Sequence, residues 1–314
     1  MRSLAVFWAL ALCGCTIFEL RPSVQPLEKK VLEGEGAAEI AVVGIDGMLT
    51  LQSAGDDMLS FQQPIGMVAE LREQLDRIAR DDDVEAIIIK INSPGGSVAA
   101  TEVIYHELLE LKRRKEIPMV AALMGVAASG GYYIACAADR IVTHPATITG
   151  SIGVLAFNVN ASELLHKIGV ENETLTSGTK KDMLSPLEPY SEAEREVVLG
   201  ILERLDAEFE NVVKTSRQLS LDQLNTATDG RIIDGERAVE LDLADQTGYL
   251  DDAIAVAKER ANLEAATVIT YARPSEYKDN VYSVRGPVRS PQAAPAWQWL
   301  GTVAQTRFMY LWMP

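Results

Sequence analysis

Histidine and cysteine are scarce in this sequence. Among 314 residues there are 3 histidines and 3 cysteines. Cys13 and Cys15 lie in an apolar leader and Cys136 lies alone in an alanine-rich run, so the cysteines form neither a disulfide framework nor the spacing of a metal site. We therefore interpret Cys136 as a small core residue, and we expect an activity that needs no metal and no other cofactor.

Positive charge is also in short supply. The 29 lysines and arginines are outnumbered by 45 aspartates and glutamates, which gives a net charge of −16. No basic patch stands out, so nucleic acid is not an expected partner. The composition is otherwise that of a soluble globular protein, with 47% apolar and 24% charged residues and enough length for one large domain or two small ones.

The first segment, residues 1–18, has the pattern of a signal peptide. Its apolar run, Leu4–Leu12, is shorter than the roughly 20 residues that span a bilayer. The letters LCGC resemble a bacterial lipobox, in which cleavage leaves a lipidated cysteine, here Cys15, as the first mature residue. An uncleaved anchor and an ordinary signal peptide are the alternatives. We expect residues 19–38 to be a linker, flexible over Glu19–Glu35, that tethers the protein to a membrane on the extracytoplasmic side of the cell envelope.

Strand-like and helix-like segments alternate over residues 39–265. Apolar runs such as 84–91 and 117–125 are typical of strands, and a segment with helical character follows each of them. This alternation predicts one α/β domain with a partly parallel sheet flanked by helices. From Ser191 onward the domain becomes more helical, and residues 266–314 form an extension that ends in an aromatic tail.

The segment GVAASGGYYIACAAD, Gly125–Asp139, places a lone serine, Ser129, among small residues with no histidine near it. A serine hydroxyl is a weak nucleophile that needs a base, and a neutral lysine is a known substitute for histidine. The sequence offers Lys180 and Lys181 in a glycine-bearing loop. Because a free lysine has a pKa of about 10.4, keeping the amine neutral at pH 7 costs roughly 4–5 kcal/mol. We therefore expect the working lysine to be enclosed beside a hydroxyl, for which Ser151 is the candidate.

A turn with the sequence NSPGGSV, Asn92–Val98, is a candidate oxyanion site. Its glycines let the backbone approach a ligand closely, and the N–H groups of Gly96 and Ser129 are the candidate donors to a developing oxyanion. Taken alone, the pattern is more typical of a simple tight turn.

Five motifs in order make the chain resemble bacterial signal peptide peptidase A, a family of serine peptidases that includes protease IV. They cover roughly residues 39–262 and read NSPGGSV, GVAASGGYYIACAAD, ITGSIGV, SGTKKDMLSP and DGRIIDGERAVELDLADQTG. The resemblance implies a Clp-protease-like or crotonase-like fold, with subunits assembled into a ring whose active sites face an inner cavity. It also implies that the substrates are membrane-released signal peptides and other small or unfolded polypeptides. The chain carries one catalytic half, like the short members of the family.

The same resemblance implies a role for each candidate residue. Ser129 is the nucleophile and Lys181 the general base, while Lys180 is a bystander. Ser151 holds the lysine, and Gly96 donates to the oxyanion. Together these roles predict a serine endopeptidase with a Ser-Lys dyad.

Two other functions fit the same fold. An acyl-CoA hydratase or isomerase shares glycine-rich oxyanion turns, but it needs an acid/base carboxylate, and no glutamate lies inside the small-residue motifs. A catalytically silent, lipid-tethered assembly protein is the other alternative, and the intact Ser129 and Lys181 argue against it.

Three further features have structural interpretations. The aromatic tail, Trp297–Trp312, either contacts a membrane surface, inserts into a neighbour's groove or packs on its own domain, and we favour the last. Tyr132 and Tyr133 are interpreted as packing residues rather than as the lining of a substrate groove. The run Asp81–Asp83 is interpreted as solvated charge rather than as a cation site.

Overall fold

A computed structural model of the chain describes residues 25–51, 65–274, 276, 278–283 and 308–313. The leader with Cys15 and the first part of the aromatic tail lie outside the described residues, so the interpretation of the leader stays a prediction. Across the described part of the chain, no helix combines the length and the apolarity that crossing a bilayer takes.

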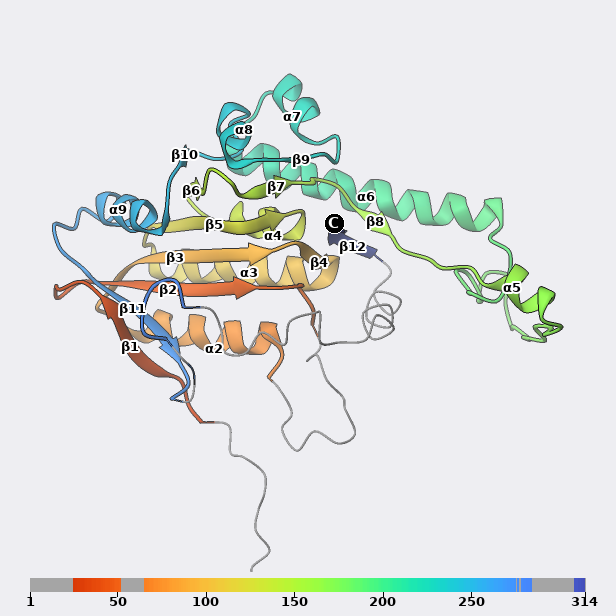
Figure 1. Ribbon diagram of the computed structural model, residues 1–314, viewed down its shortest axis with the longest axis horizontal. Helices are drawn as coiled ribbons and strands as arrows, with labels where there is room; N and C mark the ends of the chain where they lie inside the picture. The colour runs from red at the N-terminus through yellow and green to blue at the C-terminus, as the bar shows by residue number, and fades with distance from the viewer. Residues whose placement is uncertain (1–24, 52–64, 275, 277, 284–307, 314) are drawn as a thin grey trace, which may run out of the picture.

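A nine-stranded sheet forms the centre of the fold (Figure 1). Its main path runs through β1 (Glu28–Glu33), β11 (Thr267–Ala272), β2 (Glu39–Asp46), β3 (Val84–Ser93), β5 (Met119–Ala128), β6 (Arg140–Thr143) and β10 (Gln246–Thr247). Neighbours along this path are parallel, except that β1 and β11 are antiparallel. Two short strands lie off the path, with β7 (Ile148–Gly150) paired to β5 and β9 (Ile232–Ile233) paired to β7.

Helices cover both faces of this sheet. The helices of the described residues are α2 (Met67–Arg80), α3 (Val98–Lys115), α4 (Gly130–Ala135), α5 (Ser162–Lys167), α6 (Glu192–Arg217), α7 (Leu221–Ala227), α8 (Gly235–Glu240) and α9 (Leu250–Arg260), of which α5 lies apart from the sheet. Successive side chains of a strand point to opposite faces, so Ile89 of β3 packs in the core with α2 and α3, whereas Ile88 packs in the core with α9. The fold is α/β with a mostly parallel sheet flanked by helices, which confirms the prediction from the alternating segments.

A second, three-stranded sheet lies where the central strands end (Figure 1). It consists of β4 (Gly95–Ser97), β12 (Phe308–Leu311) and β8 (Leu155–Ala156) in the order β4-β12-β8, and both pairings are antiparallel. Helix α4 follows β5 after one residue and packs beside β4 and β12. Motifs from distant parts of the sequence therefore meet at this corner of the molecule.

Residues 157–191 form an arm that carries α5 and reaches away from the sheet (Figure 1). The arm ends at a capping box, in which Ser191 and Glu194 cap the first turn of α6. The arm exposes several large apolar side chains, among them Leu164, Ile168, Val170 and Leu175. Exposed apolar side chains on a projecting segment indicate a surface for contact with another molecule.

Both flanks of the expected domain take part in the folded sheets. The expected linker, residues 19–38, contains β1, which pairs with β11, and the expected extension, residues 266–314, contains β11 and β12. The flexible spacer therefore does not extend over Glu28–Glu33, because the edge of the sheet offers backbone groups with which this segment pairs. Met309, Tyr310 and Leu311 are buried, so this part of the aromatic tail packs on its own domain.

Candidate active site

Ser129 lies at the joint between β5 and α4. Its backbone has φ 53° and ψ −118°, a strained conformation of the kind that clusters at functional sites. The residue is 1% exposed. Its N–H donates to the carbonyl of Gly150 on β7 at 2.8 Å. The sheet thus fixes the backbone of Ser129 on one side, while the strained turn directs the chain into α4.

Two glycines after Ser129 let α4 pack closely against its surroundings. A methyl group on Gly131 would lie 2.6 Å from the carbonyl oxygen of Ser93, and one on Gly130 would lie 2.6 Å from the hydroxyl oxygen of Thr101. Both distances are well inside the optimal separation of non-bonded atoms. A larger residue would push α4, and Ser129 with it, away from the turn that joins β3 to β4.

Ser151 is brought close to Ser129 by the pairing of β5 with β7. Ala128 pairs with Gly150, and these two residues directly precede the two serines. Ser151 has a φ of 49°, and its N–H donates to the carbonyl of Arg231 at 2.7 Å. Both serines therefore hold a positive φ, which is uncommon for residues other than glycine.

Gly96 presents its N–H on the outer side of β4. The N–H of Ser97 donates to the carbonyl of Leu49, and the N–H of Leu49 donates to the carbonyl of Gly95, each at 2.9 Å. Because the backbone groups of successive strand residues point to opposite sides, the N–H of Gly96 points away from Leu49. The start of α4 lies close by, since a methyl group on Gly95 would be 2.8 Å from the nitrogen of Gly130.

The second expected oxyanion donor, the N–H of Ser129, is engaged elsewhere. Its hydrogen bond to Gly150 continues the contact between β5 and β7, so this N–H is committed to the sheet and the expectation is corrected. The N–H of Gly130, the first residue of α4, is the candidate donor in its place, because the first N–H groups of a helix have no partner within the helix.

Lys181 lies on the arm, and the structure does not bring it to Ser129. Its side chain is exposed, and its backbone N–H closes a turn with the carbonyl of Gly178 at 3.0 Å. The arm extends away from the corner where β5 meets α4 (Figure 1). Of the four expected catalytic and supporting residues, the structure therefore brings together Ser129, Ser151 and Gly96 and leaves Lys181 apart.

A buried lysine that the sequence analysis did not single out lies in β3. Lys90 is 4% exposed, and its ammonium donates to the carbonyls of Val281 and Ser283 at 2.9 and 2.8 Å. Burial lowers the pKa of Lys90, although Asp46 opposes this shift. Lys90 shares the strand face of Ile88, whereas α4 packs in the core on the other face. We therefore assign this amine to anchoring the segment after β11. In the sequence, the feature that indicated this buried amine is the single charged residue within the apolar run AIIIKIN, residues 86–92.

The remaining candidates are packing residues. Cys136 is buried, and burial raises the pKa of its thiol to about 11, so it is not a reactive nucleophile, as the sequence predicted. Tyr132 is fully buried, and its hydroxyl donates to the carbonyl of Leu243 at 2.8 Å. Tyr133 is equally buried but stacks on Tyr310 of β12, so it touches the tail as well as the core.

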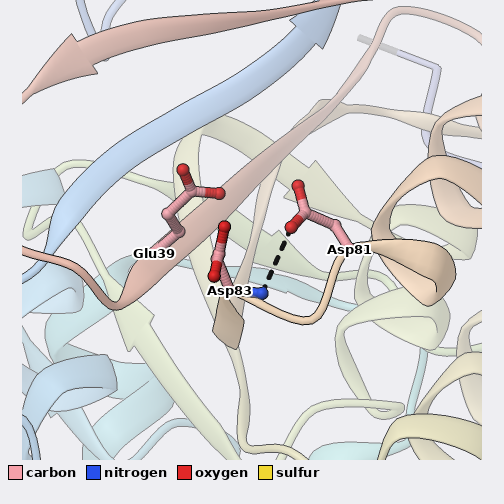
Figure 2. Close-up of side chains that lie close together, drawn as sticks. All are labelled: Glu39, Asp81 and Asp83. Carbon is pink, nitrogen blue, oxygen red and sulfur yellow. Dashed lines mark hydrogen bonds between the residues drawn. The ribbon is translucent and has the colours of Figure 1, made fainter.

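Figure 2 shows a cluster of three carboxylates, Glu39, Asp81 and Asp83, where β2 and β3 begin. The ammonium of Lys29 lies 2.7 Å from Glu39 and 2.6 Å from Asp81. The N–H of Asp83 donates to the carboxylate of Asp81 at 3.2 Å. A lysine already balances part of this negative charge, and the cluster lies at the opposite ends of the strands from Ser129, so we interpret it as a surface ion-pair network.

Two family models match the chain. The model described as peptidase family S49 matches residues 111–264, and the model described as Clp protease matches residues 58–154. The first match contains both Ser129 and Lys181, whereas the second contains Ser129 and ends before the arm. The part of the fold that holds Ser129 is therefore Clp-protease-like.

Curated relatives extend the likeness over most of the chain. A protein of Enterococcus faecium named as a signal peptide peptidase, SppA, is 36% identical over 78% of this chain and 70% of its own length. The chloroplastic serine protease SPPA of Arabidopsis thaliana is 31% identical over 79% of this chain, and Protease 4 of Salmonella typhi is 35% identical over 69%. The chain spans 36% and 35% of the length of these two longer relatives.

Proposed function

The chain belongs to peptidase family S49, and from that premise we propose that it is a membrane-tethered serine endopeptidase for signal peptides and other small or unfolded polypeptides. The family supplies the reaction, and the names of the relatives support the substrate class. The observation that carries the proposal is the strained turn at Ser129, which lies beside the outward-facing N–H of Gly96.

Membership of a serine peptidase family decides against the two alternatives. An acyl-CoA hydratase or isomerase would use a carboxylate where this chain has small residues around Ser129. A silent assembly protein would have no reason to hold Ser129 in a strained conformation, because such strain is maintained at a cost in stability.

In the proposed mechanism, the hydroxyl oxygen of Ser129 attacks the scissile carbonyl while the neutral amine of Lys181 takes its proton. The N–H groups of Gly96 and Gly130 donate to the oxyanion. Lys181 then protonates the leaving amine, and water hydrolyses the acyl-enzyme with the same amine as base. The hydroxyl of Ser151 orients that amine without restoring its charge.

We place the lysine that serves each Ser129 on a neighbouring subunit. Within one chain the arm carries Lys181 away from the sheet, and its apolar side chains stay exposed, with Leu175 at 96%. Packing the arm against a second copy would bury these side chains and enclose the lysine, which favours the neutral amine. Repetition of such a head-to-tail contact generates a ring when the rotation between subunits closes, and the proposed active form is a homo-oligomeric ring.

The proposed location is the cell envelope, with the protein held at a membrane through a lipid on Cys15. The apolar run before this cysteine and the lipobox-like letters support the tether. Metabolic labelling with radioactive palmitate tests it. Label that is present in the wild type and absent in Cys15→Ser supports the tether, and label that is absent in both contradicts it.

The catalytic proposal is tested by mixing two inactive variants. Ser129→Ala supplies an intact lysine and Lys181→Ala supplies an intact serine, and each is expected to be inactive alone. In a random 1:1 assembly, about a quarter of the sites combine an intact Ser129 with an intact Lys181 from the neighbour. We therefore expect about a quarter of the wild-type turnover.

The adjacent lysine provides the matched control. Lys180→Ala is expected to keep wild-type turnover, because Lys180 has no role in the proposed mechanism. A fluorophosphonate probe should label wild type and fail to label Ser129→Ala. Mixed assemblies that form but regain no turnover would contradict the placement of Lys181 on a neighbour, and a Ser129→Ala protein that still reacts with the probe would contradict the nucleophile.

A further inference from the structure

The turn that presents Gly96 is held by a second serine, which lies in the interior. Ser93, the last residue of β3, is 0% exposed. Its hydroxyl donates to the carbonyl of Gly47 at 2.6 Å and accepts from the N–H of Gly95 at 3.1 Å. One hydroxyl therefore joins the segment after β2 to the turn between β3 and β4.

The segment after β2 also holds Gly96 itself. Leu49 flanks it on both sides, because the N–H of Leu49 donates to the carbonyl of Gly95 and its carbonyl accepts from the N–H of Ser97, each at 2.9 Å. A methyl group on Gly96 would lie only 2.2 Å from the carbonyl oxygen of Leu49. The hydroxyl of Ser93 therefore acts on Gly96 from two sides, directly through Gly95 and indirectly through the segment that contains Leu49.

The backbone of Ser93 packs against the helix that carries the other proposed donor. A methyl group on Gly131 would lie 2.6 Å from the carbonyl oxygen of Ser93, and Gly130 directly precedes Gly131 in α4. The far end of the turn is fixed separately, because Ser97 caps α3 by accepting from the N–H of Ala100 at 3.0 Å. Ser93 is thus the residue of the turn that contacts both elements with proposed oxyanion donors.

Removal of this hydroxyl would leave one backbone group without an acceptor in a buried place. In Ser93→Ala the N–H of Gly95, which is buried, loses its acceptor, whereas Gly47 is exposed and its carbonyl is open to water. An unpaired buried N–H is costly, so the turn is expected to rotate towards another acceptor. Gly95 has a φ of 94°, and glycine offers little resistance to such a rotation. The N–H of Gly96, one residue further on, would move with it.

We propose that Ser93 is a positioning residue that aims the N–H of Gly96 at the oxyanion of the transition state. The inference rests on the proposed function, because an oxyanion forms only where the site cleaves peptides. A buried hydroxyl makes no contact with the substrate, so its loss weakens an interaction made only in the transition state and lowers kcat rather than raising KM. Misplacement by about 1 Å costs on the order of 100-fold in rate, and loss of an oxyanion donor costs about 100- to 1000-fold.

The test compares Ser93→Ala with Thr270→Val in the full-length chain on a fluorogenic peptide. Thr270 of β11 is 8% exposed, and its hydroxyl donates to the carbonyl of Val42 at 2.9 Å. The control therefore also loses a buried hydroxyl that donates to the backbone, but on the side of β2 away from β3. Turnover is expressed per site that reacts with a fluorophosphonate probe, so misfolded protein is not counted.

We expect the kcat of Ser93→Ala to fall about 10- to 100-fold, with KM within about threefold of the wild-type value. Thr270→Val should keep the wild-type kcat and KM. Ser93→Cys fills the same site with a group that forms only weak hydrogen bonds, so its kcat should lie between those of wild type and Ser93→Ala. It also carries the same measurements if Ser93→Ala does not fold. Wild-type kcat in the folded Ser93 variants would overturn the proposal.

A transition-state analogue distinguishes positioning from a loss of folded protein. A peptide aldehyde adds reversibly to the serine hydroxyl, and the oxygen of the tetrahedral adduct lies where the oxyanion donors point. Its inhibition constant should rise in Ser93→Ala by about the factor by which kcat/KM falls. A smaller folded fraction would lower turnover and leave the inhibition constant unchanged. An inhibition constant equal to that of wild type would therefore overturn the positioning role.

Hydrogen exchange separates this inference from the proposed function, because it requires no catalysis. Exchange is followed by mass spectrometry over residues 93–98 and, as an internal control, over residues 267–272. In Ser93→Ala the first segment should exchange at least about tenfold faster and the second should be unchanged. Faster exchange of the turn together with a wild type that cleaves no peptide refutes the peptidase and upholds Ser93 as the residue that orders the turn. Wild-type exchange and wild-type kcat in Ser93→Ala refute the inference and uphold the peptidase.

Discussion

The replacement of Gly131 by alanine is a direct test of how α4 positions Ser129. Gly131 has no positive φ, so alanine fits its backbone conformation and gains up to about 1 kcal/mol of helix propensity over glycine. The added methyl group, however, would lie 2.6 Å from the carbonyl oxygen of Ser93. That oxygen belongs to the backbone at the end of β3, so it cannot rotate out of the way.

The two effects oppose each other, and the steric one is larger. Overpacking of a tight site costs typically about 1–3 kcal/mol. After a gain in helix propensity of about 1 kcal/mol, we expect Gly131→Ala to lower the free energy of unfolding by up to about 2 kcal/mol. Gly200 of α6 is the matched control, because a methyl group there would meet only the guanidinium of Arg204, at 3.8 Å. Gly200→Ala should raise the free energy of unfolding by about 0.5–1 kcal/mol.

The assay is urea unfolding of both variants and of wild type, followed by circular dichroism, together with turnover of a peptide substrate. A shift of Ser129 by about 1 Å costs on the order of 100-fold in rate, so Gly131→Ala is expected to lose activity as well as stability. Gly200→Ala should keep wild-type turnover. A Gly131→Ala protein as stable and as active as Gly200→Ala would refute the reasoning that α4 is wedged against β3.

Three further predictions concern charge. Lys181→Arg should be inactive and Lys180→Arg active in the peptide assay, because a guanidinium cannot act as a base. Burial acts to raise the pKa of Asp245, but hydrogen bonds from Arg217 and from a backbone N–H outweigh it and lower the pKa. The advantage in unfolding free energy of wild type over Asp245→Asn should therefore be complete above about pH 4, the unfolded value, and should vanish as the pH falls through the folded pKa. Burial lowers the pKa of Lys90, so wild type should gain stability as the pH rises through the folded pKa towards about 10.4, and Lys90→Met should lack this gain in pH-dependent unfolding.

Local patterns in the sequence predicted the local structure well. The isoleucine run of β3 is buried on both faces of a parallel sheet, as such runs are. The cap at Ser191 begins α6, and the glycines after Ser129 begin a short, closely packed helix. Each of these elements has a local signature in the sequence, an apolar run, a cap or a glycine pair, so periodicity and capping were sufficient to predict it.

Contacts between distant segments were beyond the reach of the same reasoning. The pairing of β12 with β4 depends on which sheet edge remains open after folding, and strand propensity does not encode that. The N–H of Ser129 was expected at the oxyanion, but β7 engages it, and the position of β7 depends in turn on a pairing with β9. The position of Lys181 could not be predicted for the same reason, because a loop motif does not encode the direction in which the arm projects from the sheet.

The pairing of β1 with β11 has a practical consequence for recombinant work. A shortened protein cut to residues 39–265, the domain bounds predicted from the alternating segments, would lose both strands and leave β2 with an unpaired edge. Unpaired backbone groups along an apolar strand such as Ile40–Ile45 invite aggregation. If the shortened protein is insoluble, the cause would be the unpaired edge of the sheet, and the result would carry no information about catalysis.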